Sequence, residues 1–151
     1  MVTVVPKKRS EWWLYASLVL SFGLFGFVWP VLMARDVNEL QRRPVFPVVL
    51  LGLSFGVGGM IYLSAGFGVP AVINDKSTRL VILIAVSLLL YALQIALLIL
   101  VYRQSRIMAN LPFGAQQVAA VIALHLLMQL SFVIVQQSLN STIERGKLGQ
   151  E

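Results

Sequence analysis

Four long apolar runs constrain the fold of this chain more than any other feature. They cover approximately residues 12–33, 45–68, 80–102 and 118–135, and short polar segments containing proline or glycine separate them. A helix of about 20 apolar residues crosses the roughly 30 Å hydrocarbon core of a bilayer. The pattern predicts an all-α fold, in which residues 1–151 form a single integral membrane domain, a bundle of four transmembrane helices.

The composition agrees with a membrane protein. Charged residues make up 12% of the chain, whereas about a quarter is usual in soluble domains. The 12 lysines and arginines are distributed among the tails and loops, so no nucleic-acid partner is expected. The absence of cysteine excludes disulfides, thiol redox chemistry and zinc sites with thiolate ligands.

Four spans place both termini on the same side of the membrane, and basic residues in the loops indicate which side is cytoplasmic. The terminal side would carry Lys7, Lys8, Arg9, Lys76, Arg79, Arg145 and Lys147. The other side would carry Arg35, Arg42, Arg43, Arg103 and Arg106. This small excess favours cytoplasmic termini, in what we expect to be a bacterial cytoplasmic membrane. Aromatic residues near the ends of the runs, Trp29 among them, are expected to lie at the membrane interface.

Glycines recur in the first two runs. The stretches "LSFGLFGFVW" at residues 20–29 and "LSFGVGGMIY" at residues 53–62 share two glycines at the same spacing. Glycines let membrane helices approach closely, so helix contacts are predicted for Gly23, Gly26, Gly52, Gly56, Gly58 and Gly59. The closest contacts are expected at Gly56 and Gly59. The alternative, an unwound segment that lines a substrate or ion site, would need ionisable partners, which these two runs lack.

The same stretch carries a family resemblance. Residues 23–29, "GLFGFVW", followed by "RDVNEL" at residues 35–40, resemble the G-x-[YF]-G-x-x-W and [DE]-x-N-x-L pattern of an uncharacterised family of small bacterial multi-span membrane proteins. The resemblance covers the first run and the first loop. It implies a cytoplasmic N-terminus and no catalytic residue, because that family has no established activity.

Polar side chains form a stripe on the third and fourth predicted helices. Helical spacing puts Ser87, Tyr91 and Gln94 on one face of the third, and His125, Gln129 and Gln136 on one face of the fourth. Hydrogen bonds between helices are the simpler interpretation, and a polar conduit is the alternative. If the two runs are antiparallel, Gln94 lies opposite His125, which predicts a hydrogen bond between the amide and a neutral imidazole.

Five arginines gather at the ends of the first and third runs: Arg35, Arg42, Arg43, Arg103 and Arg106. Contact with lipid phosphates, at about 1 kcal/mol for each basic residue, is the simpler interpretation. A specific anionic ligand is the alternative. Asp36 and Glu39 are expected to pair with these arginines rather than to act as acid and base.

These features favour a small non-enzymatic membrane protein, a packing, accessory or interaction component that associates with itself or with a larger membrane protein through its glycine faces. The alternative is an oligomeric transporter or channel for ions or small solutes. In size the chain is similar to the small multidrug transporters, but its first run lacks the glutamate on which they rely. No catalytic residue, cofactor or metal is expected, because the runs hold no nucleophile–base pair and a single histidine cannot form a metal site.

Overall fold

The computed structural model describes residues 8–20, 25–66, 75–127 and 130–148. These residues form six helices: α1 (Glu11–Leu20), α2 (Phe25–Gln41), α3 (Val48–Gly66), α4 (Lys76–Met108), α5 (Ala115–Leu126) and α6 (Ser131–Leu148). No strand occurs in the described part of the chain, which confirms the predicted all-α class. The prediction of one helix for each apolar run is wrong for two of the four runs.

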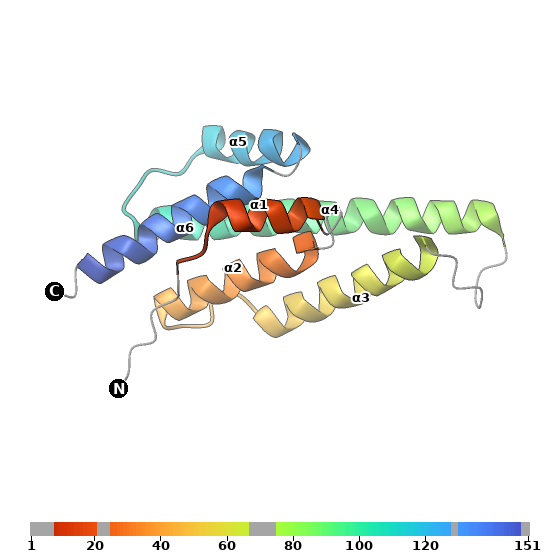
Figure 1. Ribbon diagram of the computed structural model, residues 1–151, viewed down its shortest axis with the longest axis horizontal. Coiled ribbons are helices and arrows are strands. Elements are labelled where there is room, and N and C mark those ends of the chain that lie inside the picture. Colours follow the sequence, from red (N-terminus) through yellow and green to blue (C-terminus); the bar gives the residue numbers. More distant parts are fainter. Residues whose placement is uncertain (1–7, 21–24, 67–74, 128–129, 149–151) are drawn as a thin grey trace.

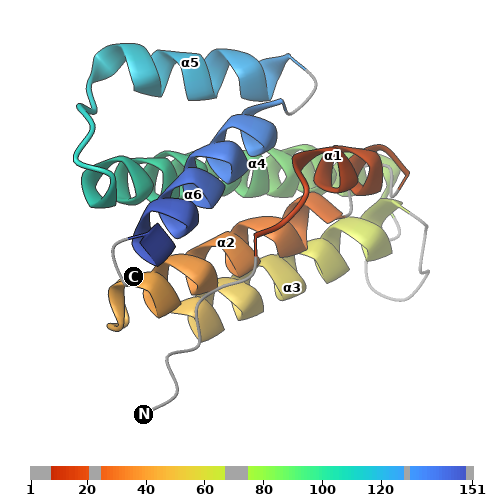
Figure 2. The same cartoon turned by 60° about the vertical axis from the view of Figure 1, so that its left-hand side comes forward.

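Successive helices run in alternating directions, so one end of each of the six helices lies at the same end of the molecule (Figures 1 and 2). This end, termed the charged end, is formed by residues 8–11, 35–47, 102–115 and 136–148. Hydrogen bonds join these segments, because Gln41 Nε2 donates to Gln104 Oε1 over 3.0 Å and Arg145 Nη1 donates to the Ala109 carbonyl over 3.0 Å. The start of α4, at residues 75–79, lies at the opposite end.

The first apolar run is divided between α1 and α2, which are antiparallel. Arg9, two residues before α1, forms an ion pair with Asp36 in the second half of α2, so the start of α1 lies beside the later part of α2. Both helices are rich in apolar residues. The apolar composition of residues 12–33 is therefore compatible with one long helix and with a helical hairpin. Pro30 lies inside α2.

The fourth run is divided in the same way between α5 and α6. Because Arg145 near the end of α6 reaches Ala109, which precedes α5, these two helices are also antiparallel. The third run is continuous within α4, which has 33 residues. Among the described residues, α4 is the one helix that is long and apolar enough to cross a membrane.

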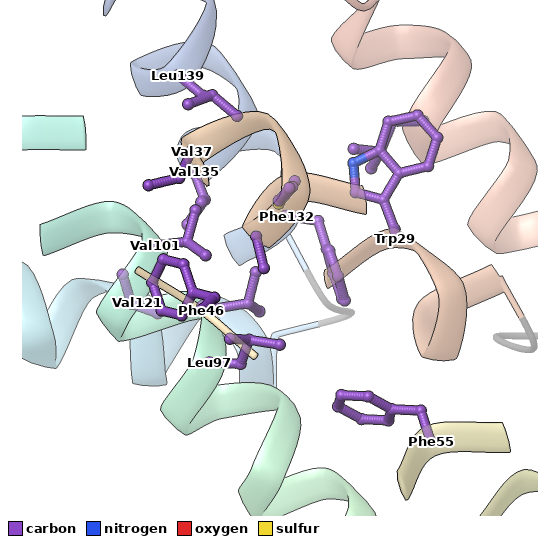
Figure 3. Close-up of a cluster of buried hydrophobic side chains, with 14 of the residues drawn as sticks. Trp29, Val37, Phe46, Phe55, Leu97, Val101, Val121, Phe132, Val135 and Leu139 are labelled. Carbon is purple, nitrogen blue, oxygen red and sulfur yellow. The ribbon is translucent and has the colours of Figure 1, made fainter. Parts of the chain in front are cut away.

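The core lies between α2, α4 and α6, with contributions from the other helices (Figure 3). Figure 3 shows side chains from separate elements directed toward one another, among them Val37, Leu97, Val121 and Phe132. Trp29, expected at the membrane interface, is part of this core and is 9% exposed. Trp12 and Trp13 are largely exposed.

Large apolar side chains are exposed over much of the remaining surface. On α3 they are Val49, Leu50, Leu53, Val57, Met60 and Ile61, and on the first half of α4 they are Leu80, Val81, Ile84, Leu88 and Leu89. Patches of this extent are rare on soluble monomers. Only 22% of the most apolar window of α4 is buried.

The glycine contacts differ from those predicted. A Cβ atom at Gly58 would collide with the Leu90 side chain, so α3 and α4 are in close contact there. A Cβ atom at Gly56 would meet no atom within 4 Å, and one at Gly52 would lie 3.9 Å from Val31 Cγ1. The prediction that Gly56 makes one of the closest contacts is therefore wrong within this chain, because the face of α3 that carries it is not covered.

The other glycines are placed as follows. Gly59 is half-buried, Gly26 is buried in the first turn of α2, and Gly23 lies outside the described residues.

Candidate functional site

Two groups of buried polar side chains stand out against the apolar background. The first consists of Tyr91 and Gln94 on α4, which reach the ends of neighbouring helices. The second lies at the charged end and ties the segment before α1 to α2 and α6.

Gln94 supplies a hydrogen bond that α2 cannot make for itself. In a regular helix the Gly26 carbonyl accepts from the N–H of residue 30, but residue 30 is proline and has no N–H. Gln94 Nε2 donates to this carbonyl over 3.0 Å, and the Gln94 side chain is buried. The amide thus satisfies a buried backbone acceptor that would otherwise be costly in apolar surroundings.

Tyr91 plays a similar role at the end of α5. The last carbonyls of a helix have no N–H donor within the helix. The Tyr91 hydroxyl donates to one of them, the His125 carbonyl, over 2.9 Å, and the two rings lie 4.6 Å apart. His125 is buried, and its Nδ1 lies 2.7 Å from Ser131 Oγ at the start of α6.

The predicted hydrogen bond between Gln94 and His125 is therefore replaced by two others. Gln94 bonds α2, because Pro30 leaves the Gly26 carbonyl without its helical partner. The His125 ring bonds Ser131, because the division of the fourth run brings the start of α6 beside it. Ser87 donates to the Leu83 carbonyl of its own helix. Gln129 lies outside the described residues.

At the charged end, Asp36 is buried at 2% exposure against two arginines. Its Oδ1 accepts from Arg9 Nη2 over 2.8 Å and lies 3.8 Å from Arg35 Nη2. Arg35 also pairs with Glu39, one turn further along α2, over 3.3 Å. The expectation that Asp36 and Glu39 pair with arginines is confirmed, although the nearest partner of Asp36 comes from the segment before α1.

Asn140 on α6 is the centre of the second group. Its Oδ1 accepts from the Arg9 backbone N–H and from Gln136 Nε2, and its Nδ2 donates to the Arg9 carbonyl and to Glu11 Oε1, all within 3.2 Å. The Trp29 indole N–H donates to Gln136 Oε1 over 3.2 Å. Together with Asp36, these residues form what we term the polar cluster: Arg9, Glu11, Trp29, Asp36, Gln136 and Asn140.

The Asp36 carboxylate is buried, which disfavours its charged form. Burial raises the pKa of Asp36 to about 6, against the opposing effect of Arg9 and Arg35. Its Oδ2 has no hydrogen-bond partner among the described residues. The carboxyl group can therefore gain a proton in mildly acidic conditions, which would weaken its ion pair with Arg9.

The predicted arginine collar is placed at the charged end, but several of its members are engaged within the chain. The Arg106 guanidinium donates to the Pro112 carbonyl over 2.9 Å and lies over the Tyr102 ring. Arg43 donates to Gln41 Oε1. Arg42, which has a positive φ of 52°, and Arg103 are exposed.

A hollow of about 230 Å³ lies between α4 and α6 at this end, and Arg106 and Arg145 are among its lining residues. Both guanidinium groups donate to backbone carbonyls, those of Pro112 and Ala109. The contacts that they make within the chain account for their positions without an anion.

The contacts of the polar cluster join segments that are far apart in the sequence. No group of three or more histidine, cysteine, aspartate or glutamate residues that could hold a metal occurs in the described part of the chain. The polar cluster joins residues more than 100 positions apart, such as Arg9 and Asn140. Asn140 is not among the predicted site residues, although its place one turn after Gln136 extends the same polar face.

Comparison with known proteins adds no further identification. No protein-family model, curated protein or solved structure matches this chain. The resemblance of residues 23–40 to a family of small bacterial membrane proteins stays a prediction.

Proposed function

We propose that this chain is a small non-enzymatic integral membrane protein that acts as a packing, accessory or interaction component in a bacterial cytoplasmic membrane. The observation that carries the proposal is the exposed apolar surface of α3 and of the first half of α4. Only 22% of the most apolar window of α4 is buried, whereas the central helix of a soluble domain would be mostly covered. Lipid is the solvent in which this surface is stable.

The distribution of polar groups supports the same proposal. The charged and amide side chains of the polar cluster lie at one end of the molecule, whereas the exposed apolar side chains occupy the sides of α3 and α4. Inside the bundle, Gln94 and Tyr91 are hydrogen-bonded to backbone carbonyls. Hydrogen bonds of this kind lower the cost of placing polar side chains in a bilayer.

The uncovered glycine face of α3 is the surface that we propose for association with a second copy or with a larger membrane protein. A Cβ atom added at Gly56 would meet no atom of another helix within 4 Å, and Leu53 and Met60 beside it are exposed. Small residues on a lipid-facing helix allow close approach of another helix. The contact at Gly58 serves packing within the chain instead.

The test begins with membrane residence. Membranes from expressing cells are washed with alkaline carbonate, and the protein is expected to stay in the pellet and to be released by detergent. Release by carbonate alone would contradict the proposal. The native mass of the purified protein, for wild type and for Gly56→Leu, then reports association, which the larger side chain is expected to weaken.

The same preparation separates the accessory role from the transporter or channel alternative. Purified protein is reconstituted into liposomes, and the flux of ions and of a dye is measured for wild type, Gln94→Leu and His125→Leu. The proposal predicts no flux above that of empty liposomes. Flux that either substitution abolishes would favour the transporter instead.

A further inference from the structure

The two helical hairpins, α1–α2 and α5–α6, end at the same level of the molecule. Gln94 marks the level of the start of α2, because it bonds the Gly26 carbonyl. Tyr91 marks the level of the end of α5, because it bonds the His125 carbonyl. These two residues of α4 are one turn apart, and Tyr91 is the middle residue of the apolar run at residues 80–102. Both hairpins thus extend from the charged end to the middle of this run.

The lengths of the helices agree with this level. Helix α1 has 10 residues and α5 has 12, which correspond to about 15 and 18 Å at 1.5 Å for each residue. The hydrocarbon core is about 30 Å thick, so each helix reaches roughly halfway through it. The apolar run of α4, at about 34 Å, crosses it completely. Helix α3 has 19 residues, about 28 Å, which is close to the same thickness.

Exposure along α4 changes at the same level. The first half of the helix exposes five large apolar side chains, from Leu80 to Leu89. Beyond it, Leu90, Leu97, Leu98 and Val101 are buried. In the half toward the charged end, the hairpins cover α4 on several sides (Figures 1 and 2). In the other half, α3 is the helix that lies beside α4 among the described residues.

Basic residues are distributed unequally between the two ends. Among the described residues, the charged end carries Lys8, Arg9, Arg35, Arg42, Arg43, Arg103, Arg106, Arg145 and Lys147, and the opposite end carries Lys76 and Arg79. Basic residues in short loops remain in the cytoplasm. The near balance that four spans would give is thus replaced by a strong asymmetry.

We propose that only α3 and α4 cross the membrane, and that both hairpins enter the cytoplasmic leaflet from the cytoplasmic side and end near the bilayer midplane. Residues 8–10, the end of α6 and the loops at residues 42–47 and 109–114 then face the cytoplasm, while the end of α3 and the start of α4 face the other side. The cytoplasmic leaflet contains parts of six helices and the other leaflet parts of two. This inference rests on the proposed membrane residence.

The absence of native cysteine allows a direct test with single introduced cysteines and an impermeant thiol reagent. Ser10→Cys, Asn38→Cys, Asn110→Cys and Ser141→Cys are expected to be protected in intact cells and labelled in inverted vesicles. Ser77→Cys, at the start of α4, is expected to give the opposite result. The native thermal stability of each variant in detergent confirms that it is folded.

Four spanning runs give a different map, because they place positions 38 and 110 on the side opposite to positions 10, 77 and 141. Labelling of Asn38→Cys and Asn110→Cys from outside intact cells would therefore overturn the proposal while leaving membrane residence intact. Release of the protein by carbonate would contradict both the proposed topology and the proposed membrane residence.

The depth of the hairpins is tested at Leu20 and Leu126, which lie at the ends of α1 and α5 and are exposed on the protein surface. Leu20→Cys and Leu126→Cys are expected to resist the reagent in intact cells and in inverted vesicles, and to react after denaturation in detergent. Reaction of either cysteine in inverted vesicles at the rate of Ser10→Cys would show that the hairpin lies at the membrane surface and would contradict the proposal.

Discussion

The Gln94 side-chain amide donates a hydrogen bond to the Gly26 carbonyl, which Pro30 leaves without its helical partner. A residue in the middle of the longest helix thus completes the first turn of another helix. The proline is accommodated because a donor from elsewhere in the chain replaces the missing N–H.

This relationship predicts a specific coupling between two substitutions. Gln94→Leu should lower the free energy of unfolding by about 1 to 2 kcal/mol, because it leaves a buried carbonyl unpaired. Pro30→Ala restores an N–H at residue 30, so Gln94→Leu should cost much less in that background. The measurement is a double-mutant cycle on unfolding in mixed micelles. Additive effects of the two substitutions would contradict this assignment.

Gly58 and Gly56 form a matched pair for testing the contact between α3 and α4. Gly58→Ala should lower the free energy of unfolding by about 1 to 3 kcal/mol, because its Cβ atom would collide with buried Leu90. Gly56→Ala adds a methyl group where there is open space and should be neutral or slightly stabilising. Thermal unfolding of monomeric protein in detergent compares the two. Equal stability of both variants would argue against the close approach at Gly58.

Asp36 should make stability depend on pH between about 4 and 6. Its pKa is raised to about 6 in the folded protein from 3.8, so the folded state binds the proton more tightly than the unfolded state does. Its contribution to stability is therefore greatest below pH 4 and falls as the pH rises through 6. Asp36→Asn should remove this dependence, whereas Glu39→Gln on the exposed side of α2 should retain it. Unfolding measured across this pH range in detergent provides the check, and an unchanged profile in Asp36→Asn would refute the assignment.

Asn140 should hold the segment before α1 against α6. Asn140→Leu leaves the Arg9 backbone groups without their partner and should lower the free energy of unfolding by about 1 to 3 kcal/mol. The loosened segment should also be cut faster by trypsin after Lys8 and Arg9. Gln137→Ala, an exposed neighbour on the same helix, is the control. Wild-type cleavage rates in Asn140→Leu would show that other contacts hold the segment.

The unequal occupation of the two leaflets predicts a preference for curved membranes. Six helices in one leaflet and two in the other spread the cytoplasmic leaflet, so the protein should favour membranes that are convex on that side. Protein reconstituted with its charged end outward should be enriched in small vesicles relative to large ones, with a labelled lipid as the reference for membrane area. An equal density of protein in small and in large vesicles would contradict this consequence of the proposed topology.

The sequence by itself determined the helical class of the protein. Apolar runs of this length form helices because a buried backbone must satisfy its own hydrogen bonds. The ion pair between Arg35 and Glu39 could also be predicted from the sequence, because residues four apart share one face of a helix. The interpretation of the polar stripe as hydrogen bonding rather than as a conduit agrees with the contacts of Tyr91 and Gln94.

The tertiary structure alone decided where two of the runs are divided. A hairpin and a single span have the same apolar composition, so the length of the run cannot distinguish them. The choice depends on which neighbouring side chains form hydrogen bonds with the helix ends. Tyr91 and Gln94 do so from α4, at 34 and 68 positions along the chain from their partners. Arg9 and Asn140, 131 positions apart, likewise meet only when α1 and α6 are packed together. Such contacts have no local signature, because they depend on how the whole bundle brings distant segments into reach.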